Sequence, residues 1–432
     1  MAAIRLTYIG GGSTRAPGTV ASLIVRGAAF AGSEIVLVDL DEGRLDIVQR
    51  LARRMAEVRG LDLRITTTTD RVAGLTDADI VLASFRPGGF EARMLDERIP
   101  LRHGVIGQET QGPGGFFMAL RSIAVFKDLV RDIERVAPRA VLINYTNPVN
   151  LVSEAITHHS DLPVISLCEG PLIFPKGAVK SAGLDPERLD AVLVGLNHTG
   201  WTVRQQYDGG DVIARIREAD ERRQRTPSGN ARSDRLLHLA STMGSLPSPY
   251  LDYYYFRDQV LAEQRAKPTT RAEDIAAEVP DYWRHYEEES RADEPALDPA
   301  RSRGGILELE LAIDVIDAIV NDTGAVSPVN VPNRGSLPGF PDDLVVEVPA
   351  VVSRTGATPI PQPPLPAAVR GLIGALGSYQ ALAAEAAWSG GRREAVAALT
   401  ANPLVGDLAL AERLFDDMAA AHRSYLPDRL LA

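Results

Sequence analysis

The sequence predicts an α/β protein in which a parallel sheet, with helices on both faces, is followed by a helix-rich α+β part. Short apolar strands alternate with helical segments over residues 1–150. The first strand runs directly into three glycines, Gly10, Gly11 and Gly12. After about residue 170 the alternation stops and helical segments dominate. Such alternation is typical of parallel sheets whose crossover helices cover both faces.

The elements of the first part follow from their hydrophobic patterns. Strands are expected where a short run is mainly apolar, and helices where apolar residues recur at helical spacing. The expected strands are 4–9, 34–39, 63–67, 79–85, 140–144 and 163–167, and the first two expected helices are 17–30 and 41–58. Pro17 suits the first turn of its helix because a proline has no amide hydrogen to leave unpaired.

Three charged stretches are expected to be irregular. Residues 86–115 are rich in glycine and charge, and so long a loop inside an α/β domain usually serves function or covers a site. Residues 222–235 and 287–303 are charged, and the second also contains proline, so both are expected to be exposed loops.

The second part has a different texture. Residues 191–201 begin as an apolar strand and end polar. Residues 210–320 are expected to be mostly helical, 327–349 return to strands and turns, and 365–425 are alanine-rich and helical. We therefore expect two domains, residues 1–170 and residues 171–432.

Composition excludes several classes of partner. The 432 residues carry a formal net charge of −11, from 46 basic and 57 acidic residues, which disfavours a nucleic-acid surface. The single cysteine, Cys168, cannot form an internal disulfide, which fits a reducing compartment. The N-terminus has no signal-peptide pattern, and no apolar run reaches the ~18 residues of a membrane helix. We expect a cytoplasmic protein with neither a nucleic-acid nor a membrane partner.

The glycine turn predicts a dinucleotide site. Glycines between a strand and a helix let the backbone approach a pyrophosphate at the helix N-terminus. The third glycine of the fingerprint is missing, since Arg15 stands there, and a plain strand-to-helix turn is the alternative. Asp39 ends the second strand, where a carboxylate holds the ribose 2′-hydroxyl, so it favours the dinucleotide, and NAD over NADP.

The segment Asn144-Tyr145-Thr146-Asn147-Pro148 follows a strand. Polar groups at the carboxyl end of a strand face the ligand crevice of an open α/β sheet. An Asx-type turn or helix cap before Pro148 is the alternative, and both interpretations can hold for different residues of the segment.

Cys168 and His198 each lie at the carboxyl end of an apolar strand. Two such positions can converge on one metal. A buried structural cysteine and a hydrogen-bonded histidine are the ordinary alternative, and a nucleophilic Cys–His pair is a third.

Two other groups of residues could take part in chemistry. Tyr250 opens an aromatic run to Tyr255, which is most often core or interface, although a tyrosine can act as a base where positive charge lowers its pKa. Four arginines fall within the 86–115 stretch, and they suit either a carboxylate or phosphate ligand or a solvated face. They are Arg86, Arg93, Arg98 and Arg102.

Taken together and in this order, these segments resemble glycoside hydrolase family 4, the NAD- and metal-dependent glycosidases. The resemblance spans nearly the whole chain and favours the branch that cleaves 6-phospho-β-glucosides. It is carried by IGGGSTRAPG (9–18), FRPGGFEARMLDERIPLRHGVIGQETQGPGGF (85–116), NYTNPVN (144–150), LCEGP (167–171), GLNH (195–198), PYLDYYY (249–255) and NVPNRGSLPGFPDDLVVEVP (330–349). The resemblance implies a Rossmann-type first domain like that of lactate and malate dehydrogenases.

The resemblance also implies an unusual mechanism, outside the paired-carboxylate scheme of most glycosidases. NAD⁺ takes hydride from C3 of the sugar, a base removes the acidified C2 proton, and the aglycone leaves by elimination. Water then adds, and NADH returns the hydride. A divalent metal, Mn²⁺ in the family, stabilises the enediolate.

Site roles carry over residue by residue. Cys168 and His198 match the metal ligands, and Tyr250 matches the base. Arg93, Asn147, Glu169 and, on a looser alignment, the phosphate-contacting Arg271 match substrate-binding positions. The expected cofactor-binding residues are Gly10, Gly11, Gly12, Ser13, Thr14, Asp39, Arg86 and Pro87.

Glu169 departs from the family pattern, which has Asn, Asp or His after the metal-binding cysteine. A carboxylate here can serve as general acid, reach the metal or favour another sugar. A family 4 enzyme for an α-linked or unphosphorylated sugar is therefore one alternative, and an NAD-dependent hydroxyacid dehydrogenase is another. The resemblance further implies a homodimer or homotetramer.

Overall fold

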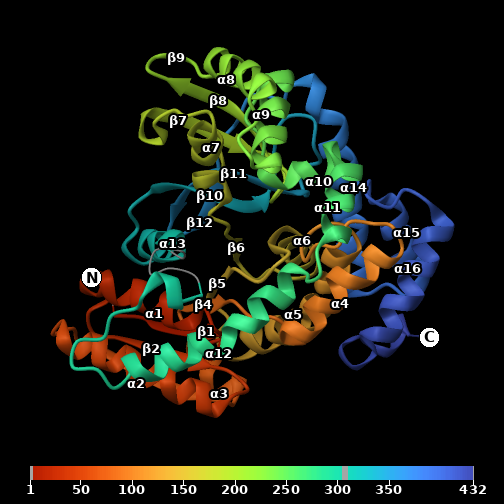
Figure 1. Cartoon of the computed structure of the whole chain (residues 1–432). Helices are drawn as coiled ribbons and strands as arrows, with labels where there is room; N and C mark the ends of the chain where they lie inside the picture. The colour runs from red at the N-terminus through yellow and green to blue at the C-terminus, as the bar shows by residue number, and fades with distance from the viewer. Residues whose placement is uncertain (1–2, 304–309, 432) are drawn as a thin grey trace.

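The computed structural model describes residues 3–303 and 310–431. The main sheet formed by these residues has nine strands (Figure 1). The strand order is β12-β11-β10-β6-β5-β4-β1-β2-β3. The strands are β1 Arg5–Ile9, β2 Ser33–Val38, β3 Leu63–Thr68, β4 Ile80–Ala83, β5 Val141–Asn144, β6 Val164–Ser166, β10 Ala325–Pro332, β11 Val345–Ser353 and β12 Gly356–Pro359.

Six of these strands are parallel and form a Rossmann sheet. The order β3-β2-β1-β4-β5-β6 has its switch point between β1 and β4, where such sheets bind ligands beyond the strands' carboxyl ends. The predicted fold class and the six predicted strands are confirmed. The sheet then continues through β10, β11 and β12, which are antiparallel and come from the second half of the chain.

The helices of the first half are α1 Ala16–Val25, α2 Glu42–Val58, α3 Arg71–Leu75, α4 Gly89–Arg102, α5 Gly112–Val136, α6 Val149–His159 and α7 Gly170–Ser181. The helix predicted over 17–30 ends at Val25, and a 3-10 turn, η1 (Gly27–Phe30), follows. The helix predicted over 41–58 is confirmed as α2, with Asp41 as its N-cap.

The prediction of a long loop over 86–115 is wrong, because α4 and the first turn of α5 occupy most of it. Its charged side chains are largely paired inside the protein, whereas their number suggested a solvated segment. Arg93 and Glu97 pair one turn apart on α4, and Asp96 makes a fully buried ion pair with Arg121 of α5. Burying charge in pairs hides the helical pattern that apolar residues would show.

The prediction of an exposed loop over 222–235 is also wrong. The helix α8 (Ile213–Arg225) extends into this stretch, and α9 (Ala231–Met243) begins before it ends. Each helix buries a narrow apolar face, with Ile216 on α8 and Leu237 on α9, while arginines cover the outer faces. The stretch 287–303 begins with the last turn of α12 (Arg271–Glu289) and is then mainly irregular, with a 3-10 turn at Pro299–Arg301, and it is half-buried to exposed except for the buried Ser290 and Leu297.

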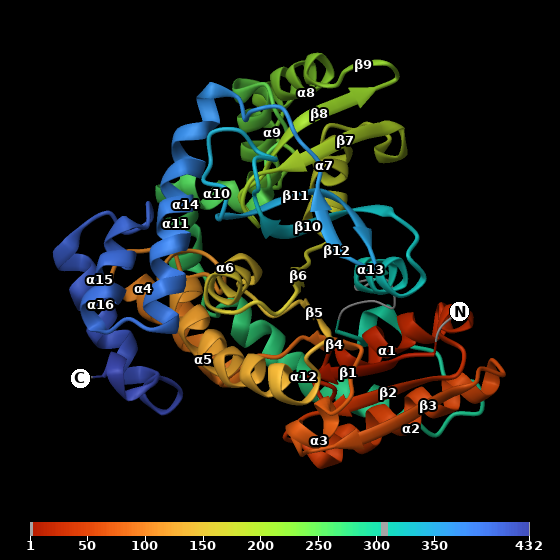
Figure 2. The ribbon, with the colours of Figure 1, turned by 180° about the vertical axis from the view of Figure 1, so that it is seen from behind.

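A second, three-stranded sheet lies beyond β10 and β11 (Figure 2). It contains β7 Leu189–Val194, β8 Trp201–Tyr207 and β9 Gly210–Asp211, and α7, α8 and α9 gather around it. The remaining helices are α10 Asp252–Tyr255, α11 Arg257–Ala266, α12 Arg271–Glu289, α13 Glu310–Asn321, α14 Ala367–Trp388, α15 Arg392–Ala401 and α16 Leu408–Ala421. The predicted helical and strand regions of the second half are thereby confirmed for the described residues, whereas residues 304–309 of the predicted helical region lie outside them.

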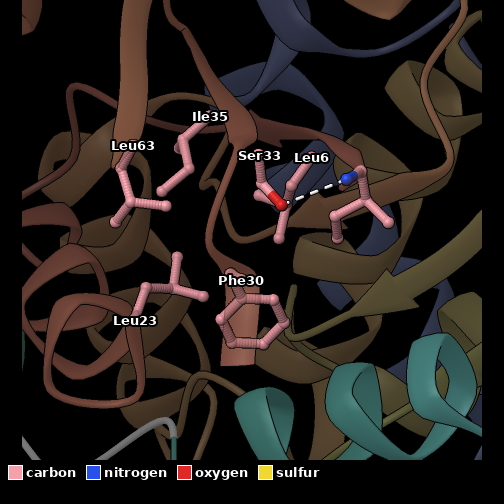
Figure 3. Close-up of a pocket in the computed structure, with 7 residues that line it drawn as sticks. Leu6, Leu23, Phe30, Ser33, Ile35 and Leu63 are labelled. Atoms are coloured by element: carbon pink, nitrogen blue, oxygen red, sulfur yellow. Dashed lines mark hydrogen bonds between the residues drawn. The ribbon is translucent and has the colours of Figure 1, made fainter. Parts of the chain in front are cut away.

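The core beside β1, β2 and β3 is closely packed. Leu6, Leu23, Phe30 and Ile35 point toward one another there, around a cavity of about 10 Å³ (Figure 3). Ser33 lines it too, but its hydroxyl accepts a hydrogen bond from the Ile4 amide at 3.0 Å. A void this small and apolar leaves no room for a ligand. Within the described residues, no helix combines the length and apolarity needed to cross a membrane.

Candidate active site

The glycine turn joins β1 to α1 at the switch point of the sheet. A Cβ on Gly10 would lie 2.1 Å from the Ser84 carbonyl oxygen after β4, and the Gly10 φ of 100° also disfavours a side chain. A Cβ on Gly11 would lie 2.7 Å from Leu37 of β2. The turn is therefore pressed against both neighbouring strands, where a side chain at Gly10 or Gly11 would not fit.

Asp39 fastens this turn to the end of β2. Its Oδ2 accepts a hydrogen bond from the Gly12 amide at 2.9 Å, and its Oδ1 accepts one from Leu40 at 2.7 Å. The carboxylate is half-buried, so it retains acceptor capacity toward the crevice. This is the geometry that a ribose-binding carboxylate requires beside a dinucleotide turn.

Other predicted cofactor residues surround the turn. Ser13 and Thr14 are half-buried at the start of α1, and the Thr14 carbonyl accepts a hydrogen bond from Tyr286. Arg86 and Pro87 follow β4, at the same edge of the sheet. The structure thus brings the predicted residues to the ends of three adjacent strands.

The segment after β5 contains both structures weighed from the sequence. Asn144 forms the Asx turn, since its Oδ1 accepts a hydrogen bond from the Thr146 amide at 2.8 Å and its amide donates to Ser166 at 3.0 Å. Asn147 is half-buried and is joined to Pro148 by a cis peptide bond. Of the two asparagines, Asn147 is the one whose side chain is not committed to the turn.

His198 and Tyr250 form a stacked pair. Their ring centroids are 3.8 Å apart and their planes differ by 2°. Thr110 Oγ1 lies 3.0 Å from His198 Nδ1, and the backbone at His198 is left-handed, with a φ of 68°. Burial lowers the pKa of His198 to about 4, so the imidazole is neutral at physiological pH and Nε2 can be a ligand atom.

Cys168 lies beside this pair. Its thiol accepts a hydrogen bond from the Gly170 amide at 3.3 Å, and it is close enough to Tyr250 for their charges to interact. Burial, and then the Glu347 carboxylate, raise the pKa of Cys168 to about 12. A nucleophilic cysteine needs a lowered thiol pKa, so the structure disfavours the Cys–His nucleophile.

The donor set suits a divalent metal only as an open site. The described residues contain no group of three or more His, Cys, Asp and Glu placed to hold an ion. Cys168 and His198 would supply one sulfur and one neutral nitrogen, and a substrate or water would have to supply the rest, as in catalytic sites. Binding would also have to displace the thiol proton. The residues fit a metal that is completed by substrate.

Glu109 was missed by the sequence reasoning. It lies between Arg86, whose Nη2 is 2.6 Å from its Oε2, and Arg93, whose Nη1 is 3.1 Å away. Despite burial, charges of Arg86, Arg93, Arg15 and Arg303 lower the pKa of Glu109 to about 2. Glu109 thus interacts with four arginines, of which Arg93 also pairs with Glu97, and a cluster so rich in arginine suits an anion. Its only signal in the sequence was its position within the 85–116 segment.

The four arginines of the 86–115 stretch fall into two groups in the structure. Arg86 and Arg93 face Glu109 inside the protein, whereas Arg98 and Arg102 are exposed on the outer side of α4. Arg93 and Arg98 lie on different faces of α4, because side chains three or four residues apart share a helix face and those five apart do not. Arg93 also interacts with the Tyr250 hydroxyl charge, which places it at the site.

Arg271 is the first residue of α12 and its side chain is exposed. The next amide, that of Ala272, donates to Glu97 at 2.8 Å, and Glu97 pairs with Arg93. The start of α12 is therefore tied to Arg93, which keeps Arg271 at the border of the site.

Glu169 follows Cys168 at the N-terminus of α7. The Tyr145 hydroxyl donates a hydrogen bond to its Oε1 at 3.0 Å. Burial and the charge of Glu169 hold the pKa of Tyr145 well above its usual range, so this tyrosine remains a donor. Tyr145 thereby fixes one oxygen of the Glu169 carboxyl group beyond the ends of β5 and β6.

A pocket of about 300 Å³ opens between α7 and α9. Its lining includes Ile173, Phe174, Arg232 and Pro249, of which Phe174 packs on Tyr250 with ring centroids 6.0 Å apart. Its volume is at the lower end of the ~300–1,000 Å³ of small-molecule pockets. The pocket is therefore adjacent to Tyr250 through Phe174 and Pro249.

Comparison with known proteins gives consistent matches. The model of the family 4 glycosyl hydrolases matches residues 5–183, and that of the family's C-terminal domain matches residues 193–405. A probable 6-phospho-beta-glucosidase of Bacillus subtilis is 37% identical, over 98% of this chain and 97% of its own. A 6-phospho-alpha-glucosidase of Leptotrichia buccalis is 30% identical, over 98% of each.

A solved structure matches over the same extent. The 6-phospho-beta glucosidase of Thermotoga maritima, determined with manganese, NAD⁺ and glucose-6-phosphate, superposes with a TM-score of 0.84 at 26% identity. The match covers 98% of this chain and 99% of that one. The resemblance therefore extends to the arrangement of the whole chain.

Proposed function

The chain belongs to family 4 of the glycosyl hydrolases, and from this premise we propose that it is an NAD- and divalent-metal-dependent 6-phospho-β-glucosidase. The observation that carries the proposal is the convergence of Cys168, His198 and Tyr250, since Cys168 follows β6 at the same edge of the parallel sheet as the glycine turn after β1. A glycosidase with paired carboxylates would not need a dinucleotide turn, and a simple dehydrogenase would not need a metal site. The manganese, NAD⁺ and sugar phosphate of the Thermotoga protein support both requirements.

The chain's own residues provide binding and orientation. NAD⁺ and the cation, when bound, supply the oxidation at C3 and the electrophile that acidifies the C2 proton. Gly10, Gly11 and Gly12 would accept the pyrophosphate, and Asp39 the ribose. Cys168 and His198 would hold the cation. We assign residues 1–170 to the NAD-binding domain and residues 171–432 to the substrate-binding and oligomerisation domain.

We assign Tyr250 as the base that takes the C2 proton. In the protein alone, burial and the charges of Glu109 and Cys168 raise its pKa, so its hydroxyl is held protonated. A cation held by Cys168 and His198 would supply positive charge that opposes this shift. The Tyr250 hydroxyl oxygen would then take and hold the C2 proton.

We assign Glu169 as the group that protonates the leaving oxygen. It is adjacent to Cys168 in sequence, and the Tyr145 hydrogen bond orients it. Asn147 would bind the sugar hydroxyls from the end of β5. A carboxylic acid can donate a proton that an asparagine cannot, so Glu169 would serve substrates with poor leaving groups.

The phosphate group has two sources of positive charge. The first is the group of arginines around Glu109, to which Arg93 belongs. The second is Arg271 at the border of the site, on a helix whose first turn is hydrogen-bonded to Glu97 of the Arg93–Glu97 pair. Guanidinium forks match phosphate geometry well. This arrangement favours a phosphorylated sugar over a neutral one.

We assign the pocket between α7 and α9 to the leaving group. Ile173 lines it, whereas its neighbour Leu172 is similarly exposed but lies outside. Ile173→Ala should therefore raise the KM for aryl glycosides several-fold, and Leu172→Ala should leave it unchanged. Equal KM values for the two variants would exclude the pocket as the leaving-group site.

One assay separates this function from its alternatives. The protein is incubated with nitrophenyl 6-phospho-β-glucoside, catalytic NAD⁺ and Mn²⁺, with and without chelator, beside the α-anomer and the unphosphorylated glucoside. We expect chelator-sensitive nitrophenol release without net NADH, and incorporation of deuterium at C2 in D₂O. Faster release from either comparison glucoside would reassign the substrate, and stoichiometric NADH with a hydroxyacid would reassign the reaction class.

We further propose a cytoplasmic homodimer or homotetramer. A sugar phosphorylated during uptake is found in that compartment, and the absence of an internal disulfide fits it. Size-exclusion chromatography with light scattering measures the assembly directly.

A further inference from the structure

Glu347 is a buried carboxylate in the middle of β11 that none of the assigned roles uses. Its residue is 1% exposed. It lies opposite Asn330 of β10, and its backbone pairs with Gly195 through two hydrogen bonds, of 2.8 and 3.1 Å. It therefore sits where the nine-stranded sheet meets the strand that leads to His198.

One oxygen of Glu347 joins the two segments that carry the predicted metal ligands. Its Oε1 accepts a hydrogen bond from Asn197 at 2.8 Å and another from Asn330 at 3.1 Å. Asn197 directly precedes His198. Asn330 pairs with Ser166, the residue two positions before Cys168. The Asn197 amide also interacts with the Cys168 thiol, so it lies between that thiol and Glu347.

The other oxygen, Oε2, is buried and has no hydrogen-bond partner among the described residues. No cationic side chain in the same part of the chain pairs with Glu347, and burial raises its pKa to about 7. An unpaired buried carboxylate is destabilising, which an apolar or amide residue would avoid. A cation at Cys168 and His198 would supply the missing opposite charge.

Glu347 is not itself a ligand in this arrangement, because it forms no three-donor group with Cys168 and His198. We propose that Glu347 is a positioning residue for the divalent cation. It holds the two ligand segments together through Asn197 and Asn330, and its negative charge would stabilise a cation held by Cys168 and His198. This inference rests on the proposed metal site.

The test is Glu347→Gln, which keeps the shape and the accepting oxygen but removes the charge. Glu154→Gln is the matched control. Glu154 is also fully buried, and its Oε2 accepts hydrogen bonds from the Val345 amide and the Gln380 side chain, but it belongs to α6 and is outside the assigned site.

Two measurements are made on NAD⁺-saturated protein: Mn²⁺ affinity by calorimetry, and the rise in Tm caused by Mn²⁺. Loss of a residue that supports metal ligands weakens metal binding by ~10- to 100-fold. We expect Glu347→Gln to show this loss, with a smaller Mn²⁺-dependent rise in Tm and no loss of Tm in the metal-free protein. Glu154→Gln should bind Mn²⁺ like the wild type.

Three results would overturn the inference. Wild-type Mn²⁺ affinity in folded Glu347→Gln would show that the charge is irrelevant. A lower metal-free Tm with an unchanged Mn²⁺-dependent rise would show a merely structural role. If Glu347→Gln does not fold, Glu347→Asp, which keeps the charge, is compared with Asn330→Ala, which removes one hydrogen bond between the ligand segments. Weaker Mn²⁺ binding by Glu347→Asp than by Asn330→Ala would be the third such result. A wild type that binds no Mn²⁺ would instead remove the metal site, and with it the proposed function.

Discussion

Tyr250 lies flat against the His198 imidazole, with Phe174 and Tyr253 around its edges. Its hydroxyl is the only group that Tyr250→Phe removes, so the packing of the ring on His198 should persist. We expect this variant to lose turnover by at least ~10²-fold, the usual contribution of a positioned base. Steady-state hydrolysis of nitrophenyl 6-phospho-β-glucoside measures the loss, and NAD⁺ binding should be unchanged.

Tyr255→Phe is the control for Tyr250→Phe. It removes a hydroxyl from the same aromatic run, but Tyr255 packs on Trp201 rather than on His198. It should retain wild-type turnover. Comparable losses in both variants would mean that hydroxyls of the run stabilise the fold, and Tyr250 would no longer qualify as the base.

Glu109 should contribute to stability in a defined pH range. Its folded-state pKa, about 2, lies below the usual 4.5, so the stabilising contribution is fully present above pH 4.5 and is lost as the pH falls toward 2. Removing one partner of a buried ion pair typically costs ~3–5 kcal/mol. We expect Glu109→Gln to lose stability of this order at pH 7.

Urea unfolding at pH 7 and at several values below 4.5 measures both effects. The wild type should lose free energy of unfolding steeply as the pH falls through this range, and Glu109→Gln less steeply. Parallel pH profiles would show that Glu109 is not held ionised by the arginines.

Sequence reasoning located single residues unevenly. Cys168, His198 and Asn147 follow strands, so the rule that polar groups at carboxyl ends face a ligand made them candidates, and the family resemblance gave them their predicted roles. Glu109 and Thr110 lie between two helices, and Glu347 lies inside a strand, where no local pattern distinguishes a functional carboxylate. Their importance arises from pairing with residues far away in the sequence, and this cannot be obtained from spacing alone.

Among the elements, the strand–turn–helix unit of β1 and α1 leaves no room for a side chain at its first glycine. A methyl group on Gly10 would overlap the Ser84 carbonyl oxygen at 2.1 Å, and its backbone is left-handed. We expect Gly10→Ala to abolish NAD⁺ binding and to lower the Tm, because β1 and β4 must separate at the switch point. Intrinsic fluorescence quenching by NAD⁺ and a thermal melt test this.

Gly43→Ala is the control at the start of α2. A methyl there would meet only Asp41 Oδ1, at 3.5 Å, an ordinary contact. It should leave NAD⁺ binding intact and raise the Tm slightly, since alanine is the better helix former. Retention of NAD⁺ binding in Gly10→Ala would argue against this turn as the pyrophosphate site.

The helix α4 shows why the stretch 86–115 was wrongly predicted to be a loop. Its inward face carries Arg93, Asp96 and Glu97 as well as Ala92 and Ile99, so charge occupies positions that apolar residues normally fill. Periodicity measures hydrophobicity alone and treats such a face as exposed. The strands of the parallel sheet, buried on both faces, have no such ambiguity, and their bounds agreed within a few residues.

At the scale of the whole molecule, the two halves share one sheet and one core. β10 inserts beside β6, and α14 packs against α5 and α6. The largest hydrophobic cluster extends from Ile4 to Leu430. In the sequence, the alternation of strand and helix patterns ends near residue 170. The sequence could not show that later strands pair with the first sheet, because strand pairing across such a distance leaves no local signal.

Unfolding of the complete chain should reflect this shared core. We expect a single thermal transition in calorimetry, with coincident loss of far-UV circular dichroism and of the fluorescence of Trp201, Trp283 and Trp388. We propose that NAD⁺ binds the first half, yet its binding should raise the Tm of the entire transition, because neither half can unfold without exposing the other's core. Two transitions, of which only one moves with NAD⁺, would mean that β10 and α14 do not couple the halves energetically.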